Sequence, residues 1–217
     1  MSAPQNAKPV IAAFDFDGTL TTRDTLFPFL LQVAGPLKFS LKLITLLPTL
    51  TLYALGLLRN DVAKVIVLRR FLANMQMSDL QQQALIFATN KLPALLRNEA
   101  MQRLAWHKQQ GHRCIVVSAS LENYLSPWAN TVGFNDILCS RLELLEGDRT
   151  SGNLLGENCF GPEKMRRLQA LLGPREGYIL YAYGDSRGDK ELLSAADFAF
   201  YKKFAEVGKM YGAQNPP

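Results

Sequence analysis

Two aspartates, Asp15 and Asp17, follow directly after the short apolar run at 10–14, which predicts a buried strand. Side chains two positions apart on an extended segment point the same way, so both carboxylates would enter one small volume. Like charges this close raise the pKa of one carboxyl group unless a cation lies nearby. The pair therefore predicts a metal site, an acid/base role, or both, whereas Asp17-Gly18 considered alone is typical of a hairpin turn.

Two further apolar runs end in polar groups. The run at 179–183 leads into a segment with Asp185 and Asp189, and the run at 113–117 ends in Ser118-Ala119-Ser120. A helix predicted at about 121–132 follows the serines, and its N-terminal amides are suited to binding a phosphate. Lys164 begins another helical stretch after the loop at 156–162. Ligands of parallel α/β sheets bind outside the carboxyl ends of the strands, so these groups are predicted to meet there.

The order of these segments along the chain resembles a known family. Asp15-x-Asp17-Gly18-Thr19, then Ser118, then Lys164, then Gly184-Asp185-x-x-x-Asp189 resemble the four motifs of the haloacid dehalogenase (HAD) superfamily of phosphohydrolases. Each motif alone is weakly specific, but the ordered set is strongly specific and covers the chain apart from two short tails. The long insert looks like the helical cap of the phosphoserine-phosphatase-like subfamily IB. The segment at 181–197 and the apolar insert look most like the bacterial group that includes a phosphatidylglycerophosphate phosphatase.

The resemblance implies an α/β fold, with a Rossmann-like parallel-sheet core and an inserted all-helical cap. We expect residues 1–22 and 101–217 to form the catalytic core and residues 23–100 to form the cap. Helical segments are predicted at roughly 26–33, 37–46, 49–58, 61–72 and 78–97, with Pro28, Pro36, Pro48 and Pro93 at starts or kinks. A hairpin is predicted within 137–155, a further strand at 198–201, and a frayed tail at 214–217.

The resemblance also implies a role for each motif residue. Asp15 is expected to attack phosphorus as the nucleophile and form an aspartyl-phosphate, and Asp17 to act as general acid and then general base. Mg²⁺ is the expected cofactor, held by Asp15, the backbone carbonyl of Asp17 and Asp185, with Asp189 orienting metal-bound water.

Phosphate binding is expected from groups around the nucleophile. Ser118, the amide of Ala119 and Lys164 would bind the phosphate, with Gly18 allowing close backbone approach and Thr19 fixing the loop. The alternative to phosphate binding for Ser118, considered alone, is to cap the end of a strand. The alternative for Lys164 is a solvent-exposed position on a helix. Their order relative to the aspartates favours the catalytic roles.

The composition fits a soluble globular protein of 217 residues, with 48% hydrophobic residues. Its three cysteines, Cys114, Cys139 and Cys159, form no metal-binding or disulfide pattern and predict reduced, packed thiols in a cytoplasmic protein. The segment at 1–9 shows no secretory signal. His107 and His112 flank a glycine in a polar turn and are predicted to be surface residues.

The net charge of +5 lies in the insert, where residues 25–100 contain eight basic and three acidic residues. This distribution predicts a basic lid over an acidic core, and the chain shows no nucleic-acid-binding motif. The segment at 25–58 is rich in leucine and carries only Lys38 and Lys42 as charges. It could pack inside a helical bundle or form a peripheral contact with the inner face of the membrane. A membrane span is disfavoured, because the charge-free run at 43–58 is short and contains Pro48.

The expected substrate is a phosphomonoester. Ala119-Ser120 stand where phosphoserine phosphatases commonly have two glycines, and Gly18 stands where they often have serine, which disfavours phosphoserine itself. A leucine-rich, basic cap favours a lipid phosphate such as phosphatidylglycerophosphate. The alternatives are a phosphatase of a small soluble metabolite, a phosphotransferase, and a non-catalytic membrane-surface binding module.

Overall fold

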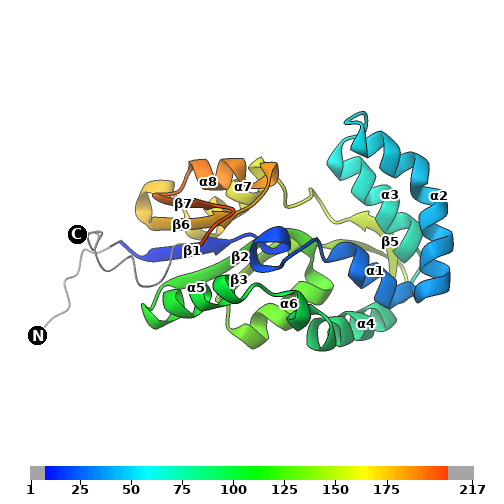
Figure 1. The fold of residues 1–217 in the computed structure, drawn as a ribbon, viewed down its shortest axis with the longest axis horizontal. Coiled ribbons are helices and arrows are strands. Elements are labelled where there is room, and N and C mark those ends of the chain that lie inside the picture. Colours follow the sequence, from blue (N-terminus) through cyan, green and yellow to red (C-terminus); the bar gives the residue numbers. More distant parts are fainter. Residues whose placement is uncertain (1–7, 205–217) are drawn as a thin grey trace, which may run out of the picture.

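The computed structural model describes residues 8–204, so the predicted tail at 214–217 lies outside the described residues. A five-stranded parallel sheet with the order β3-β2-β1-β6-β7 forms its centre (Figure 1). The strands are β1 (Val10–Phe14), β2 (Arg113–Leu121), β3 (Asp136–Ser140), β6 (Ile179–Gly184) and β7 (Phe198–Tyr201). The predicted α/β fold with a parallel sheet is therefore confirmed.

Helices cover both faces of this sheet, which explains why its central strands are apolar at consecutive positions. Ala12 and Phe14 belong to the hydrophobic cluster under α5 (Asn98–Gln109) and α6 (Glu122–Val132), on the lower side in Figure 1. Ile11 and Ala13 point to the opposite face, where they pack under α7 (Pro162–Leu172) and α8 (Lys190–Ser194). Because successive side chains of a strand point to opposite faces of the sheet, the apolar residues of β1 contribute to two hydrophobic cores.

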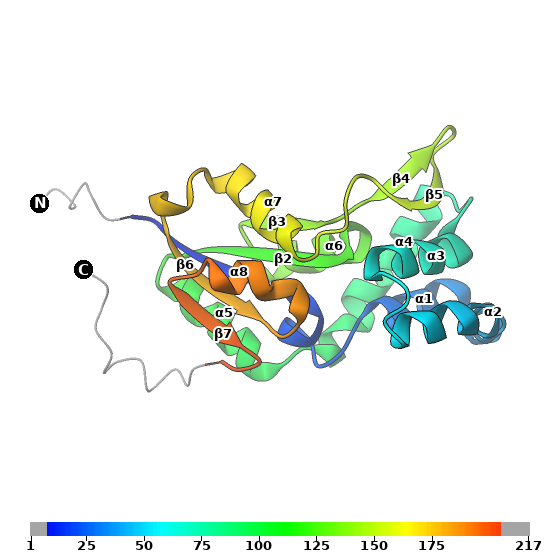
Figure 2. The same cartoon turned by 90° about the horizontal axis from the view of Figure 1, so that it is seen from above.

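Four helices and a short 3-10 turn lie beyond the carboxyl ends of the strands (Figures 1 and 2). They are α1 (Leu26–Ala34), α2 (Pro36–Ala54), α3 (Asn60–Leu72), α4 (Met77–Asn90) and η2 (Leu92–Leu95). The insert is helical, as expected. We keep the name cap for residues 23–100, whose boundaries stay a prediction.

The helix α2 differs from the prediction, because one helix replaces the two predicted at 37–46 and 49–58. Pro48 lies inside it on the exposed side, and the missing hydrogen bond there does not end the helix. Phe39, Leu46 and Leu50 lie on one face and belong to the main hydrophobic cluster, so packing holds both halves in line. The helix predicted at 78–97 ends earlier, at Asn90, and Pro93 falls in η2.

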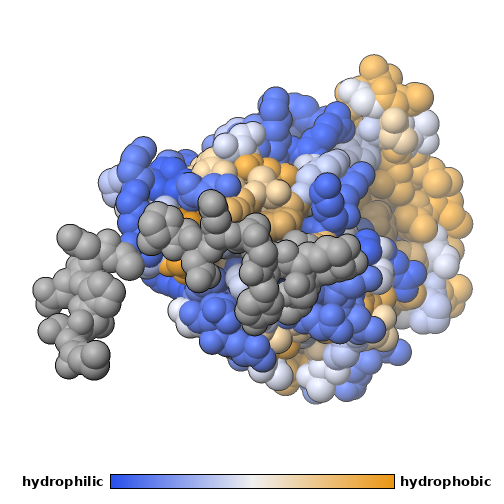
Figure 3. Space-filling model, turned by 60° about the vertical axis from the view of Figure 1, so that its left-hand side comes forward, coloured by the Kyte–Doolittle hydropathy of each residue, from blue (hydrophilic) through white to orange (hydrophobic). Residues whose placement is uncertain are grey.

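The apolar side chains of α2 are mostly exposed, so the alternative in which the segment at 25–58 packs inside a helical bundle does not describe this helix. Only 6% of its most apolar stretch is buried, and it is long and apolar enough to cross a membrane. The large exposed side chains on and just after it include Leu37 (74%), Leu41 (57%), Ile44 (61%), Leu47 (54%) and Leu55 (67%). We call these five residues the leucine surface. Figure 3 shows hydrophobic residues gathered over the cap, at the right of the view.

The predicted hairpin consists of β4 (Leu142–Leu145) and β5 (Arg149–Leu154), and it packs against the cap (Figure 2). The backbone amide of Asn74 donates to the Thr150 carbonyl at 2.8 Å, and the Thr150 amide donates to the Met75 carbonyl at 2.9 Å. The link between α3 and α4 is thereby joined to a segment of the predicted core.

The prediction that His107 is a surface residue is wrong. Its side chain is fully buried, because α5 packs against the aromatic side chains of β1 and β6. His107 Nε2 lies 2.8 Å from the Tyr183 hydroxyl, and its Nδ1 lies 2.7 Å from His112 Nδ1. His112 itself is half-buried. The three cysteines are free and buried, as expected.

Candidate active site

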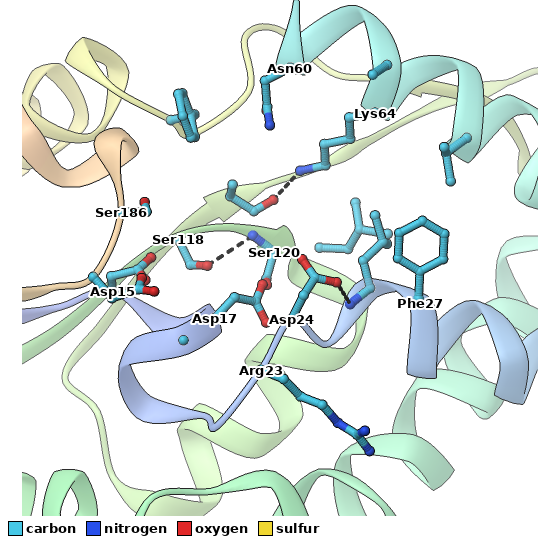
Figure 4. A pocket seen from close by; sticks show the side chains of 18 of the residues that line it. Asp15, Asp17, Arg23, Asp24, Phe27, Asn60, Lys64, Ser118, Ser120 and Ser186 are labelled. Atoms are coloured by element: carbon cyan, nitrogen blue, oxygen red, sulfur yellow. Dashed lines mark hydrogen bonds between the residues drawn. The ribbon is translucent and has the colours of Figure 1, made fainter. Parts of the chain in front are cut away.

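The predicted site residues lie around one cavity of 510 Å³ between the carboxyl ends of the strands and the cap (Figure 4). Seven of them line it: Asp15, Asp17, Gly18, Ser118, Ala119, Lys164 and Asp185. Thr19 and Asp189 are buried beside the carboxylates. Residues from four distant parts of the sequence are thus brought together, because β1, β2 and β6 are neighbours and end at the same edge.

Three carboxylates form a cluster at this edge. Asp15 follows β1 and Asp185 follows β6, and one oxygen from each of Asp15, Asp185 and Asp189 lies within 4.8 Å of the others. The Thr19 hydroxyl lies between two of these carboxylates, 3.1 Å from Asp15 Oδ2 and 3.4 Å from Asp185 Oδ1, and can donate its proton to either. An all-oxygen set of carboxylates is the donor chemistry that Mg²⁺ prefers.

Lys164 supplies a positive charge to this cluster. Its Nζ lies 2.5 Å from Asp15 Oδ1 and 2.6 Å from Asp189 Oδ1, and the side chain is 2% exposed. Burial alone would lower the pKa of Lys164, but the two aspartates raise it above its ordinary value. Burial raises the pKa of Asp15 to about 7 despite the lysine. A single ammonium does not balance three crowded carboxylates, so the site fits a second cation.

Hydrogen bonds from the segment that precedes α8 fix the side chain of Asp189. Its Oδ2 accepts from the Ser186 amide at 3.0 Å and the Ser186 hydroxyl at 2.9 Å, and from the Asp185 amide at 3.2 Å. The Ser186 hydroxyl in turn accepts from the Gly188 amide, which completes a reciprocal capping arrangement. Burial raises the pKa of Asp185, with the negative charge of Asp189 as the second cause.

The Asp17 side chain points away from the cluster. Its Oδ1 accepts from the Thr25 amide at 2.8 Å and the Thr25 hydroxyl at 2.6 Å, and its Oδ2 accepts from the Ser120 hydroxyl. Burial, followed by the negative charge of Asp24, raises the pKa of Asp17 to about 6, against these hydrogen bonds. The carboxyl group is therefore placed to exchange a proton near neutral pH. The participation of its backbone carbonyl in metal binding stays a prediction.

The end of β2 contributes hydroxyl and backbone groups. Ser118 is buried, and its hydroxyl accepts from the Ser120 amide at 3.0 Å. Figure 4 shows both serines between Asp15 and the cap, with Asp17 directly below them in the view. The pairing of Ser118 with its neighbour leaves its own proton available to a phosphate oxygen.

One lysine of the site, Lys64 of α3, was not predicted. It reaches from the cap to the end of β2, where its Nζ donates to the Ala119 carbonyl and, at 2.8 Å, to Asn158 Oδ1. Burial lowers the pKa of Lys64 to about 8, opposed by the charges of Asp17 and Asp24. The sequence did contain a signal: Lys64 adjoins Ala63 and precedes Val67 by three positions, so helical periodicity places it near the buried face.

Thr25 and Ser120 were also not predicted as residues of the site. Both orient Asp17, one from the start of the cap and one from the core. Ser120 could have been found from its position two residues after Ser118 on an extended segment. Thr25 gave no comparable signal, because its contact with Asp17 depends on how the chain enters α1.

Comparison with known proteins gives consistent results. The family described as haloacid dehalogenase-like hydrolase matches residues 12–194. Protein CicA of Caulobacter vibrioides is 33% identical over 204 residues, which cover 94% of this chain and 90% of that protein. A protein with unknown function from Bordetella pertussis Tohama I has a solved structure with a TM-score of 0.74 at 23% identity, covering 87% of each chain. A substrate-bound phosphoserine phosphatase has a TM-score of 0.60 at 18% identity, covering 90% of this chain and 87% of that one.

Proposed function

The chain belongs to the haloacid dehalogenase-like hydrolase family, and on that basis we propose that it is a magnesium-dependent phosphatase of phosphomonoesters acting through an aspartyl-phosphate. The observation that carries the proposal is the contact of Lys164 with both Asp15 and Asp189, beside Asp185. These residues combine a nucleophile, a fixed positive charge and a set of metal ligands in one place.

The first chemical step forms a bond between a carboxylate oxygen of Asp15 and phosphorus. The bond from phosphorus to the leaving alcohol oxygen breaks, and Asp17 donates its proton to that oxygen. Ser118, the Ala119 amide and Lys164 bind the remaining phosphoryl oxygens as charge shifts onto them.

The second step removes the phosphoryl group from Asp15. Asp17, now ionised, takes a proton from water as the water oxygen attacks phosphorus, and the bond from phosphorus to Asp15 breaks. Asp15, Asp185 and the carbonyl of Asp17 would hold Mg²⁺, which when bound neutralises charge on the phosphate and the carboxylates. Inorganic phosphate and regenerated Asp15 are the products.

We propose that the substrate is a lipid phosphomonoester such as phosphatidylglycerophosphate, reached at the surface of a membrane. The leucine surface supports this proposal, because its five large apolar side chains are exposed on and just after one helix. No Asp or Glu occurs between positions 25 and 60, whereas Lys38 and Lys42 do. Such a helix fits the headgroup region of an anionic bilayer.

The helix α2 is expected to lie along the bilayer rather than across it. Its inner face is attached to α3, since the Phe39 and Phe71 rings are 5.4 Å apart and Arg70 Nε donates to Thr45 Oγ1 at 2.8 Å. A spanning orientation would break these contacts. The protein is therefore proposed to be cytoplasmic and peripheral to the membrane.

The test of activity is phosphate release with Mg²⁺ from lipid phosphomonoesters in mixed micelles and from soluble ones, including phosphoserine. We expect hydrolysis that Asp15→Asn abolishes and that Asp79→Asn, an exposed carboxylate of α4, leaves intact. Absence of hydrolysis from every ester would reject the proposal. Hydrolysis of soluble esters alone would reject the lipid substrate, and phosphorylation of an added alcohol would identify a phosphotransferase.

The test of membrane contact is sedimentation with vesicles that contain phosphatidylglycerol. We expect Ile44→Asp with Leu47→Asp to reduce the bound fraction at least tenfold, because two charged groups would have to enter the interface. Leu85→Asp on α4 is the matched control, since Leu85 and Leu47 are each 54% exposed. Equal binding of all three proteins, or no binding by the wild type, would contradict the proposed contact.

A further inference from the structure

The catalytic cavity has a polar end and an apolar end. Asp15, Ser118 and Lys164 line the polar end, where the phosphate would bind. The cap adds apolar side chains to the lining, namely Leu26, Phe27, Leu50, Ala63 and Val67, together with polar ones such as Asp24 and Asn60. Figure 4 shows Asp15 and Phe27 at opposite sides of the pocket, with Asp17 and Asp24 between them.

Three cap helices build the apolar end. Phe27 comes from α1, Leu50 from α2 and Val67 from α3, and α2 packs against both α1 and α3. Leu26, Phe27 and Leu50 are only half-buried although they face a cavity rather than the outer surface. Apolar surface left uncovered inside a pocket is typical of a site that binds an apolar group.

The same helix connects this end of the cavity to the leucine surface. Leu46, Leu50 and Tyr53 follow the spacing i, i+4, i+7 and so share one face of α2. Leu37, Leu41 and Ile44 follow the spacing i, i+4, i+7 on the opposite face. Leu50 and Tyr53 on one face of α2 therefore line the cavity, whereas the opposite face carries exposed apolar side chains. A single packed helix has no structural need for two apolar faces.

We propose that the apolar end of the cavity is a subsite for an alkyl chain joined through the substrate to the phosphate at Asp15. This inference rests on the proposed phosphatase function and specifies its substrate class as phosphate esters with an apolar tail. Phe27, Leu50 and Val67 contact the tail. Lys64 and Asn60, which also line the cavity, lie above Asp17 and Asp24 in Figure 4 and face the linking part of the ester.

The experiment uses n-alkyl phosphates from butyl to octyl, each below its micelle-forming concentration, with Mg²⁺ and no membrane. We expect kcat/KM to rise by roughly twofold to fourfold for each added methylene, since each methylene leaves water for an apolar site. Leu50→Ser should flatten this dependence and lower the octyl-to-butyl ratio. Leu52→Ser is the matched control, because Leu52 lies on the same helix, is exposed and does not line the cavity.

A second variant keeps the test decisive if Leu50→Ser does not fold. Leu50→Trp fills the apolar end instead of emptying it, and we expect it to lower kcat/KM for octyl phosphate more than for butyl phosphate. Equal kcat/KM across the series in the wild type, or an unchanged slope in folded Leu50→Ser or Leu50→Trp, would overturn the subsite. Absence of hydrolysis from every ester would instead reject the phosphatase function, so the two failures are distinguishable.

Discussion

The backbone of Gly18 lies directly against the Asp185 carboxylate, so that a β-carbon at position 18 would be 2.2 Å from Asp185 Oδ2. Gly18 also has a φ of +78°, in the left-handed region that favours glycine. Both properties belong to the short turn at Phe16–Leu20 that follows Asp15. The glycine therefore determines how closely the first acidic strand end approaches the second.

We expect Gly18→Ala to weaken Mg²⁺ activation, because the Asp185 carboxylate must turn away from Asp15 to make room for the methyl group. The Mg²⁺ concentration for half-maximal activity should rise by roughly tenfold or more, as it does when the orientation of metal ligands is disturbed. Gly173→Ala is the matched control, since Gly173 has a φ of +83° but a β-carbon there would meet no neighbouring atom within 4 Å. Equal Mg²⁺ activation of both variants would contradict this role of Gly18.

Metal removal is expected to abolish turnover. Three carboxylates and one ammonium leave net negative charge where a phosphate must bind, so the free protein should repel its substrate. Phosphate release should fall to background in EDTA and return with added Mg²⁺, whereas Asp185→Asn should lower Mg²⁺ affinity measured by calorimetry. Full activity in EDTA after extensive dialysis would show that the cluster does not hold a catalytic metal.

The pH dependence of activity should respond to Ser120. The pKa of Asp17 is raised to about 6, chiefly by burial, and the hydrogen bond that the Ser120 hydroxyl donates to Asp17 Oδ2 keeps this pKa from rising further. Ser120→Ala removes this hydrogen bond, so the pKa of Asp17 should rise, and the limb of the kcat/KM profile that reports Asp17 should move to higher pH. Ser40→Ala, an exposed hydroxyl of α2, should leave the profile unchanged. An unshifted limb in Ser120→Ala would mean that another group sets it.

The acidic end of this site could be predicted from the sequence because Asp15 and Asp185 directly follow strands and Ser118 lies near the end of a third. Once the strands pair in parallel, Asp15, Ser118 and Asp185 must lie at one edge of the sheet. The helices of the cap could be predicted, but the contacts that its side chains make with the core could not. The position of Lys64 depends on how α3 packs over β2, and the continuity of α2 through Pro48 depends on tertiary contacts of residues on both sides of the proline.

The burial of His107 makes stability depend on pH. Burial, followed by the charge of Arg103, lowers the pKa of His107 to about 2, against about 6.5 in an unfolded chain. Below pH 6.5 the imidazole of His107 is protonated in the unfolded chain but not in the folded protein. The free energy of unfolding therefore falls by up to about 1.4 kcal/mol for each unit by which the pH is lowered. His107→Gln should lessen the loss of stability between pH 7 and pH 5 in urea unfolding.

His112→Gln is the comparison for this effect. His112 is only half-buried, and burial lowers its pKa as well, so we expect a smaller change in the pH dependence from this variant. An equal fall in the unfolding free energy of wild type and His107→Gln on acidification would show that other groups cause it.

Lys64 should make substrate affinity depend on alkaline pH. Burial lowers the pKa of Lys64 to about 8, so its positive charge is present below that pH and is lost above it. If the ammonium attracts the anionic ester, KM should rise as the pH increases through about 8, and Lys64→Gln should lower kcat/KM by roughly 10- to 100-fold at pH 7. Lys64→Arg should remove the alkaline rise in KM, because a guanidinium stays charged. Lys91→Gln, an exposed lysine of the cap, should behave as wild type, and a KM independent of pH in the wild type would contradict a role for Lys64 in binding substrate.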